Sequence, residues 1–163
     1  PDRNNSHLRM IRNKEENRVE CTERLCREFV ETCRSRGIRV TDQRLAVYRA
    51  LAGDLSHPSA DSLYSKVRLQ MPSMSLGTLY RTLEFLASEH LIRRVSGTEA
   101  VGRFDANLDH HQHLVCRACG MLADIYRENR KGFTMPEVEG FTIEDLDIRF
   151  VGICKDCSEK LNT

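Results

Sequence analysis

The stretch SLGTLYRTLEFLASEHLIRRVSGTEAVGRFD, residues 75–105, joins an amphipathic helix to two short strands. In its first half, apolar residues recur at spacings of three and four, which is the period of one buried helix face. In its second half, two short runs flank Ser96 and Gly97, a pair typical of a β-hairpin turn. Ser75 can cap the helix, so the pattern predicts a helix followed by a hairpin. The residues expected on the buried face are Leu76, Leu79, Leu83 and Leu86.

Further predicted helices precede this stretch. Apolar residues at helical spacing cover residues 20–36. Thr41 can cap a helix over residues 42–52, and Ser59 can cap another that ends before Pro72. Helices in this order, followed by a hairpin, are typical of a winged helix-turn-helix. The first helix has three cysteines on its apolar stripe, which favours packing over a redox role. They are Cys21, Cys26 and Cys33.

Beyond Asp105 the sequence changes to short strands. The segments HLVC, LADIY and LDIRFVGIC are rich in β-branched residues, and CSEKLN predicts a last short helix. We therefore expect an α+β protein with three parts. They are a polar N-terminal arm over residues 1–19, a winged-helix domain over residues 20–104, and an α/β domain over residues 105–163.

The charge is divided unevenly along the chain. The net charge of the 163 residues is +1, but residues 1–98 contain 17 Lys+Arg and 12 Asp+Glu, and residues 99–163 contain 8 and 12. A basic first part suits contact with phosphate, and an acidic second part suits a bound cation. No apolar run is long enough to span a membrane, and no secretory signal is evident, so we expect a cytoplasmic protein without a membrane partner.

Two cysteine pairs predict a structural zinc site. Cys116 and Cys119 form one CxxC pair, and Cys154 and Cys157 form another, with 34 residues between the pairs. Zn²⁺ takes four thiolates in tetrahedral geometry, and a two-residue gap lets both sulfurs of a pair reach one ion. A redox CxxC motif is the alternative, but two equivalent pairs favour a shared metal. Because four sulfurs close the coordination shell, such a site would be structural.

A second candidate metal site lies around the tetrapeptide HHQH. His111 and His113 are two residues apart on a predicted strand, so their side chains share one face. Asp105 and Asp124 lie nearby in the sequence, and His57 lies in a turn between two predicted helices. Nitrogen and oxygen donors suit Mn²⁺, Fe²⁺ or Zn²⁺. An isolated histidine is more often a surface residue, but three of the six histidines in one tetrapeptide favour a metal site.

The fourth helix and its hairpin suit contact with double-stranded DNA. Arginine and tyrosine can reach base edges or sugars, whereas hydroxyl groups and the amides of a helix N-terminus bind phosphate. The alternative is that Tyr80 packs in the core and Arg81 is a solvated charge. We predict DNA contacts from Thr41, Gln43, Arg44, Ser75, Thr78, Tyr80 and Arg81.

Several motifs together resemble the ferric uptake regulator family. They are TDQRLAVYRAL, SHPSADSLY, SLGTLYRTL, RFD, HHQHLVCRACG and CKDC, in family order over about residues 20–160. The resemblance implies a winged-helix domain followed by a C-terminal dimerisation domain. It also implies a homodimeric repressor whose DNA binding requires a metal at the hinge between the domains.

The resemblance also implies residue roles and a branch of the family. The hinge metal, Fe²⁺ or Mn²⁺, would bind His57, Asp105, His111, His113 and Asp124, and zinc would bind the four paired cysteines. Aspartate at position 124 resembles the peroxide-responsive branch, in which H₂O₂ reacts with bound Fe²⁺ and oxidises a ligand histidine. By resemblance, the oxidised residues would be His57 and His111.

Three alternatives remain open. Within the family, the chain could be an iron-responsive repressor without peroxide sensing. From another class, a metalloenzyme could use the histidine and aspartate ligands, although no general base is evident outside that set. A third alternative is a zinc-stabilised DNA-binding module with no sensing role. We expect a regulator that is not an enzyme.

Overall fold

The computed structural model describes residues 8–9, 15–95, 102–127, 136, 138–143, 146 and 148–161. The chain forms two compact units. We call residues 12–109 the N-terminal unit, and residues 110–163 together with strand β1 (Leu8–Arg9) the C-terminal unit.

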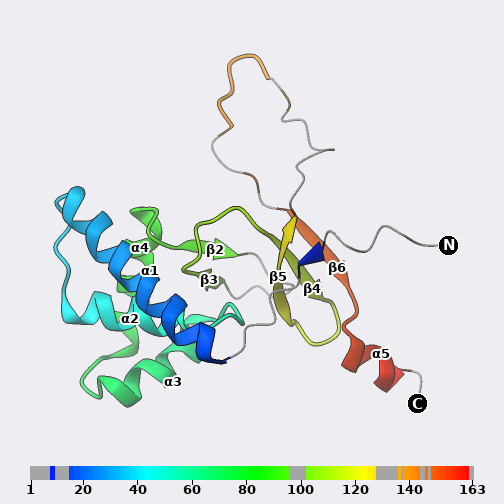
Figure 1. Ribbon diagram of the computed structural model, residues 1–163, viewed down its shortest axis with the longest axis horizontal. Helices are drawn as coiled ribbons and strands as arrows, with labels where there is room; N and C mark the ends of the chain where they lie inside the picture. The colour runs from blue at the N-terminus through cyan, green and yellow to red at the C-terminus, as the bar shows by residue number, and fades with distance from the viewer. Residues whose placement is uncertain are drawn as a thin grey trace. The chain divides into compact units, whose positions relative to one another are not determined.

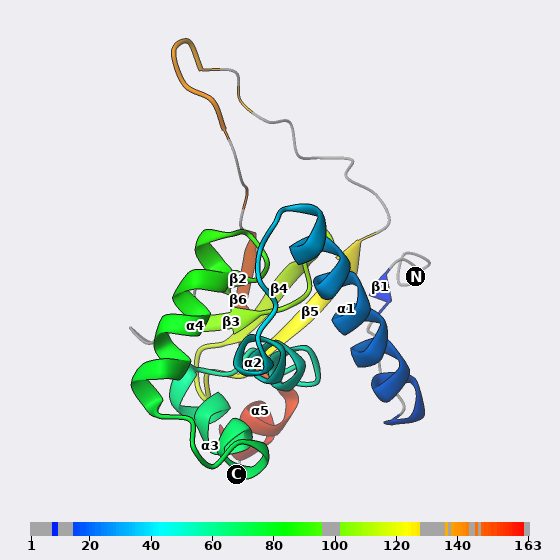
Figure 2. The same ribbon diagram turned by 90° about the vertical axis from the view of Figure 1, so that its left-hand side faces the viewer.

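The N-terminal unit is the predicted winged helix (Figures 1 and 2). Side chains at the residues preceding α2, α3 and α4 accept a hydrogen bond from the backbone N–H three residues later. These N-caps are Thr41, Ser59 and Ser75, as the sequence predicted. The elements are α1 (Glu15–Ser35), α2 (Asp42–Ala52), α3 (Ala60–Gln70), α4 (Leu76–Ser88), β2 (Arg93–Val95) and β3 (Arg103–Asp105).

One apolar core joins the helices of this unit. Helix α2 contacts α1, α3 and α4, and the aromatic rings of Phe29 and Tyr48 stack with their centroids 4.1 Å apart. Three of the four leucines predicted for the inner face of α4 are fully buried, and Leu76 is half-buried. Residues that are completely or almost completely buried here include Cys33, Leu51, Leu63, Leu79, Leu83 and Leu86.

Two boundaries differ from the sequence prediction. Helix α1 begins at Glu15 rather than Glu20, and Leu8 and Arg9 pair with strand β5, so the expected arm over residues 1–19 contains regular structure. The sequence has two glutamates at the new start, Glu15 and Glu16, and acidic residues near a helix N-terminus interact favourably with the helix dipole. Asp105 belongs to the N-terminal unit because it pairs with Arg93 across β2 and β3. The hairpin turn expected at Ser96 and Gly97 lies outside the described residues.

The C-terminal unit contains a four-stranded sheet in the order β1-β5-β4-β6 (Figure 1). Strands β4 and β5 are antiparallel, whereas β6 runs parallel to β4 and places Gly152 beside Cys116. The third predicted strand is shorter than expected, because only four of its residues pair with β4. The other elements are β4 (Gln112–Cys116), β5 (Leu122–Arg127), β6 (Arg149–Gly152) and α5 (Lys155–Leu161).

Candidate metal centres and nucleic-acid interface

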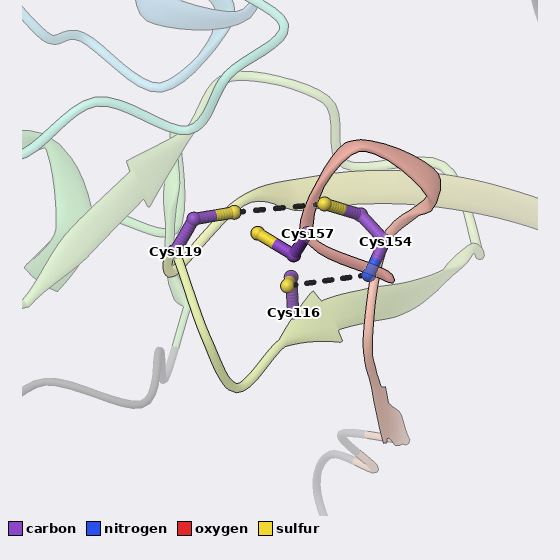
Figure 3. Close-up of side chains that lie close together, drawn as sticks. All are labelled: Cys116, Cys119, Cys154 and Cys157. Atoms are coloured by element: carbon purple, nitrogen blue, oxygen red, sulfur yellow. Dashed lines mark hydrogen bonds between the residues drawn. The ribbon is translucent and has the colours of Figure 1, made fainter. Parts of the chain in front are cut away.

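The structure brings the four predicted zinc ligands together inside the C-terminal unit. Cys116 ends β4, Cys119 lies in the following turn, Cys154 follows β6, and Cys157 is in the first turn of α5. One sulfur atom from each lies within 4.8 Å of the other three. Figure 3 shows the four sulfurs pointing toward one another. The parallel pairing of β6 with β4 is what places the second cysteine pair beside the first.

The spacing of the sulfurs fits a tetrahedral zinc ion. The Sγ atoms of Cys119 and Cys154 are 3.7 Å apart. Two sulfurs bound to one zinc ion at about 2.3 Å in tetrahedral geometry lie about 3.8 Å from each other. A disulfide would instead require a sulfur separation of about 2 Å. Gly120 has a φ of 70°, which glycine adopts without strain, and this allows the tight turn that follows the first pair.

The electrostatics of the cluster also favour a bound cation. The backbone N–H of Cys154 donates to Cys116 Sγ over 3.3 Å. This bond, with backbone N–H groups of Cys119 and Ala118, lowers the pKa of Cys116 to about 6. Conversely, the neighbouring thiols of Cys154 and Cys119 raise the pKa of Cys157 to about 12. Four thiolates therefore need a positive charge among them, and a Zn²⁺ ion would supply it.

A second group of donors lies on β4 and β5 of the C-terminal unit. His113 and Asp124 are directly opposite each other across the two strands, and His111 lies just before β4. The Nε2 atoms of His111 and His113 are 3.0 Å apart, and Oδ1 of Asp124 lies 3.6 Å and 3.9 Å from them. Two nitrogens bound to one ion at about 2.1 Å lie about 3.0–3.4 Å apart, so the histidine pair fits a shared metal.

The N-terminal unit holds the other two predicted ligands. His57 lies in the turn before α3 and is only 2% exposed, and Asp105 ends β3. His57 Nε2 and Asp105 Oδ2 are 3.5 Å apart, which exceeds an ordinary hydrogen bond but suits two ligands of one ion. The structure thus forms a pair of donors in one unit and a trio in the other. Their mixed nitrogen and oxygen chemistry suits Mn²⁺, Fe²⁺ or Zn²⁺.

The predicted DNA-contact residues gather at the N-terminal ends of α2 and α4. A hollow of about 270 Å³ there is lined by five of the seven, and no carboxylate lines it. Arg44 lies over the ring of Phe85, with its guanidinium carbon 3.8 Å from the ring centroid, and its Nη1 donates to Arg39 O. The five predicted residues are Thr41, Gln43, Arg44, Thr78 and Arg81.

The other two predicted contact residues do not line this hollow. Ser75 caps α4 through a hydrogen bond from Thr78 N. Tyr80 is 39% exposed, and its hydroxyl group donates to Asp61 on α3 over 3.1 Å. Tyr80 therefore does not pack in the core, which was the alternative drawn from the sequence. Sequence reasoning missed Phe85, whose half-buried ring packs against the Arg44 guanidinium group. Its position one helical turn after Arg81 on α4 is the sequence feature that could have indicated it.

The three cysteines of α1 lie apart from both metal centres in the sequence, and two of them pack in the core as predicted. Cys33 is fully buried and Cys26 is nearly so, while Cys21 is half-buried. Burial raises the pKa of the Cys26 and Cys33 thiols, which keeps them protonated and unreactive.

One known family and several known proteins are similar to the chain. The model of the ferric uptake regulator family matches residues 35–151. The peroxide operon regulator of Bacillus subtilis strain 168 is 30% identical over 138 residues, which cover 83% of the chain and 95% of that protein. The peroxide-responsive repressor PerR of Staphylococcus epidermidis is 30% identical over 142 residues, covering 83% and 91%.

A solved structure shows the same fold. The ferric uptake regulator of Helicobacter pylori, described as having three functional metal-binding sites, superposes with a TM-score of 0.61 at 22% identity, covering 84% of the chain and 93% of that protein. Among the residues described here, no helix has both the length and the apolar character needed to cross a membrane.

Proposed function

The chain belongs to the ferric uptake regulator family, and from this we propose that it is a metal-dependent repressor that senses peroxide and binds operator DNA as a homodimer. The two relatives named for peroxide regulation support this branch. The family consists of transcriptional regulators, and we propose that the chain has no enzymatic activity of its own. A regulator that acts on DNA in a bacterial cell works in the cytoplasm, and we place this chain there.

The observation that carries this proposal is the division of donors between the two units. His57 and Asp105 belong to the N-terminal unit, whereas His111, His113 and Asp124 belong to the C-terminal unit. We propose that all five bind the same Fe²⁺ or Mn²⁺ ion. An ion that takes ligands from both units stabilises only the arrangement in which the two sets meet, and so shifts the population toward it.

The residues around the hollow supply the proposed DNA interface. Arg44 and Arg81 provide positive charge, and the N-terminal ends of α2 and α4 present backbone N–H groups and the positive ends of two helix dipoles. Contacts of this kind to phosphate fix the position of a protein on DNA, and side chains of α4 can then reach base edges.

The C-terminal unit supplies the proposed dimer surface. Strand β6 is exposed along its whole length, and the apolar side chains Phe150, Val151 and Ile153 face solvent in the single chain. A second copy of the chain would bury such a surface, as is typical of isologous dimers. The zinc site fixes β6 and α5 to β4, so zinc would stabilise this surface without taking part in sensing.

Exposure of the Fe²⁺-loaded protein to H₂O₂ should add one oxygen atom to His57 or His111. Iron bound beside a histidine ring would supply the redox chemistry. One oxygen atom of H₂O₂ would be added to the ring and the other would leave as water. The modified peptides can be identified by tandem mass spectrometry. The exposed His90 and His110 are internal controls that should stay unmodified. The Mn²⁺-loaded protein should show no modification and should keep its operator affinity.

The same experiment separates peroxide sensing from iron sensing. If His57 and His111 of the Fe²⁺-loaded protein stay unmodified after H₂O₂ treatment and the operator affinity is unchanged, the chain is an iron-responsive repressor. If operator affinity is the same with and without Mn²⁺ or Fe²⁺, the chain is a DNA-binding module without a sensing role.

Replacing Arg81 with alanine should lower operator affinity by about 5- to 150-fold, because a base contact of arginine contributes about 1–3 kcal/mol. Fluorescence anisotropy with labelled operator DNA measures the loss. Arg68→Ala is a matched control, because Arg68 is an exposed arginine in the last turn of α3, outside the hollow. Equal effects of the two substitutions would mean that only total charge matters and that the hollow is not the DNA interface.

A further inference from the structure

The backbone of His57 has a conformation that its sequence disfavours. Its φ is 51°, in the left-handed region that residues other than glycine seldom adopt. The next residue is Pro58, and a residue before proline normally prefers an extended backbone. A conformation that is unfavourable for both reasons persists only where the surrounding structure imposes it.

Arg103, on strand β3, fixes the turn that carries His57. Its Nη1 donates to the carbonyl oxygen of His57 over 3.2 Å, and it lies 3.5 Å from the carbonyl oxygen of Ser56. The guanidinium group is charged at all relevant pH values, so these are charge-assisted bonds to the backbone of the ligand residue itself. One side chain thus contacts two successive carbonyl groups of the turn.

Backbone contacts also join the His57 turn to strand β3. Phe104 N donates to the carbonyl oxygen of Pro58 over 3.2 Å, and Ser59 forms an isolated β-bridge with Arg103. Ser59 is also the N-cap of α3. The turn, strand β3 and the start of α3 are therefore joined into one element of the N-terminal unit.

Strand β3 also carries the second ligand of this unit. Asp105 follows Arg103 by two residues, and its Oδ1 accepts a hydrogen bond from Asn107 N over 2.8 Å. That bond orients the carboxylate with Oδ2 at 3.5 Å from His57 Nε2. The separation of the two ligand atoms therefore depends on how firmly the His57 turn is attached to β3.

We propose that Arg103 is a positioning residue that holds the His57 turn in its strained conformation, so that the two ligands of the N-terminal unit are ready to bind metal. The proposal rests on the proposed regulatory metal site. Without the guanidinium group, the turn would populate the extended conformations that a residue before proline prefers. The apparent metal affinity would then fall by the fraction of molecules that keep the ligand geometry.

The experiment measures Mn²⁺ affinity of the full zinc-loaded chain by isothermal titration calorimetry. Arg103→Met keeps the length of the side chain and removes all its donors. It should weaken Mn²⁺ binding by about 10-fold, the equivalent of one charge-assisted hydrogen bond. Arg103→Lys keeps one charged donor group and should weaken binding less, by about 3-fold. Arg94→Met is the matched control, because Arg94 lies on the adjacent strand β2 and pairs with Glu84; its Mn²⁺ affinity should not change.

Three outcomes would overturn the proposal. They are an unchanged affinity in Arg103→Met, an equal loss in Arg94→Met, and a loss in Arg103→Met that Arg103→Lys does not partly restore. The unfolding temperature of each variant is measured in parallel, and if Arg103→Met fails to fold, an unchanged affinity in the folded Arg103→Lys variant decides against the proposal. The His57→Ala variant distinguishes a failure of the proposed regulatory metal site from a failure of the proposed role of Arg103. If His57→Ala also leaves Mn²⁺ affinity unchanged, the regulatory site itself is wrong; if it weakens binding while Arg103→Met does not, only the role of Arg103 is wrong.

Discussion

The Cys154→Ser variant should lose its zinc and the folded structure of the C-terminal unit, while the N-terminal unit stays folded. Cys154 joins the segment after β6 to the turn after β4, through a sulfur 3.7 Å from Cys119 Sγ and a backbone N–H that donates to Cys116 Sγ. Serine cannot replace a thiolate as a zinc ligand with comparable affinity.

The effect should be large because the described part of this unit has only a small apolar core. The large buried apolar cluster lies in the N-terminal unit, whereas among the described residues of the C-terminal unit the buried apolar side chains are Val115, Cys116, Leu122 and Ile125. In the C-terminal unit, all four residues of β6 are exposed and α5 has no buried residue. A structural zinc site contributes about 10 kcal/mol or more to folding at neutral pH, which is comparable to the whole stability of a domain, about 5–15 kcal/mol.

Elemental mass spectrometry measures the zinc content of each variant, and circular dichroism during heating measures its unfolding. Wild-type protein should contain one zinc per chain, and Cys154→Ser should contain almost none and lose the unfolding transition of the C-terminal unit. Cys21→Ser is the matched control, since Cys21 is a half-buried cysteine on α1. Acidification should release zinc from wild-type protein, because protons compete with zinc for the thiolates. Full zinc and unchanged unfolding in Cys154→Ser would contradict a structural role.

Local signals were enough to predict the helices of the N-terminal unit. Thr41, Ser59 and Ser75 each place a side-chain acceptor just before an apolar repeat of helical period, and each caps the helix that follows. Helix α2 has the predicted bounds for the same reason. The start of α1 was missed because glutamates at a helix N-terminus stabilise it without any apolar period.

Contacts between distant segments were harder to predict. The two CxxC pairs predict four zinc ligands because their spacing is itself a geometric requirement. Nothing local to β6, in contrast, shows that it pairs in parallel with β4, which is separated from it by a long segment. Arg103 has no motif that links it to His57, because its role depends on a contact across 46 residues of chain.

The His57→Ala variant should abolish the gain in operator affinity that Mn²⁺ gives to the wild-type protein. Removing one of two ligands from the N-terminal unit leaves the ion bound mainly by His111, His113 and Asp124 of the C-terminal unit. An ion bound by one unit alone binds all arrangements of the two units with equal affinity. Such an ion does not shift the population toward any one arrangement. We expect Mn²⁺ to raise operator affinity of wild-type protein by about 5- to 150-fold, the usual range of coupling between two sites, and to leave that of His57→Ala almost unchanged.

Thermodynamic linkage gives this prediction an independent check. If Mn²⁺ raises operator affinity by some factor, operator DNA must raise Mn²⁺ affinity by the same factor. Anisotropy titrations with labelled DNA give the first factor, and calorimetric titrations of Mn²⁺ with and without operator DNA give the second. His110→Ala is the matched control, since His110 is exposed and adjacent to His111, and it should keep both factors. Full zinc content in both variants would show that the structural site is intact. If His57→Ala then kept the wild-type factors for both operator affinity and Mn²⁺ affinity, the metal would act without joining the two units.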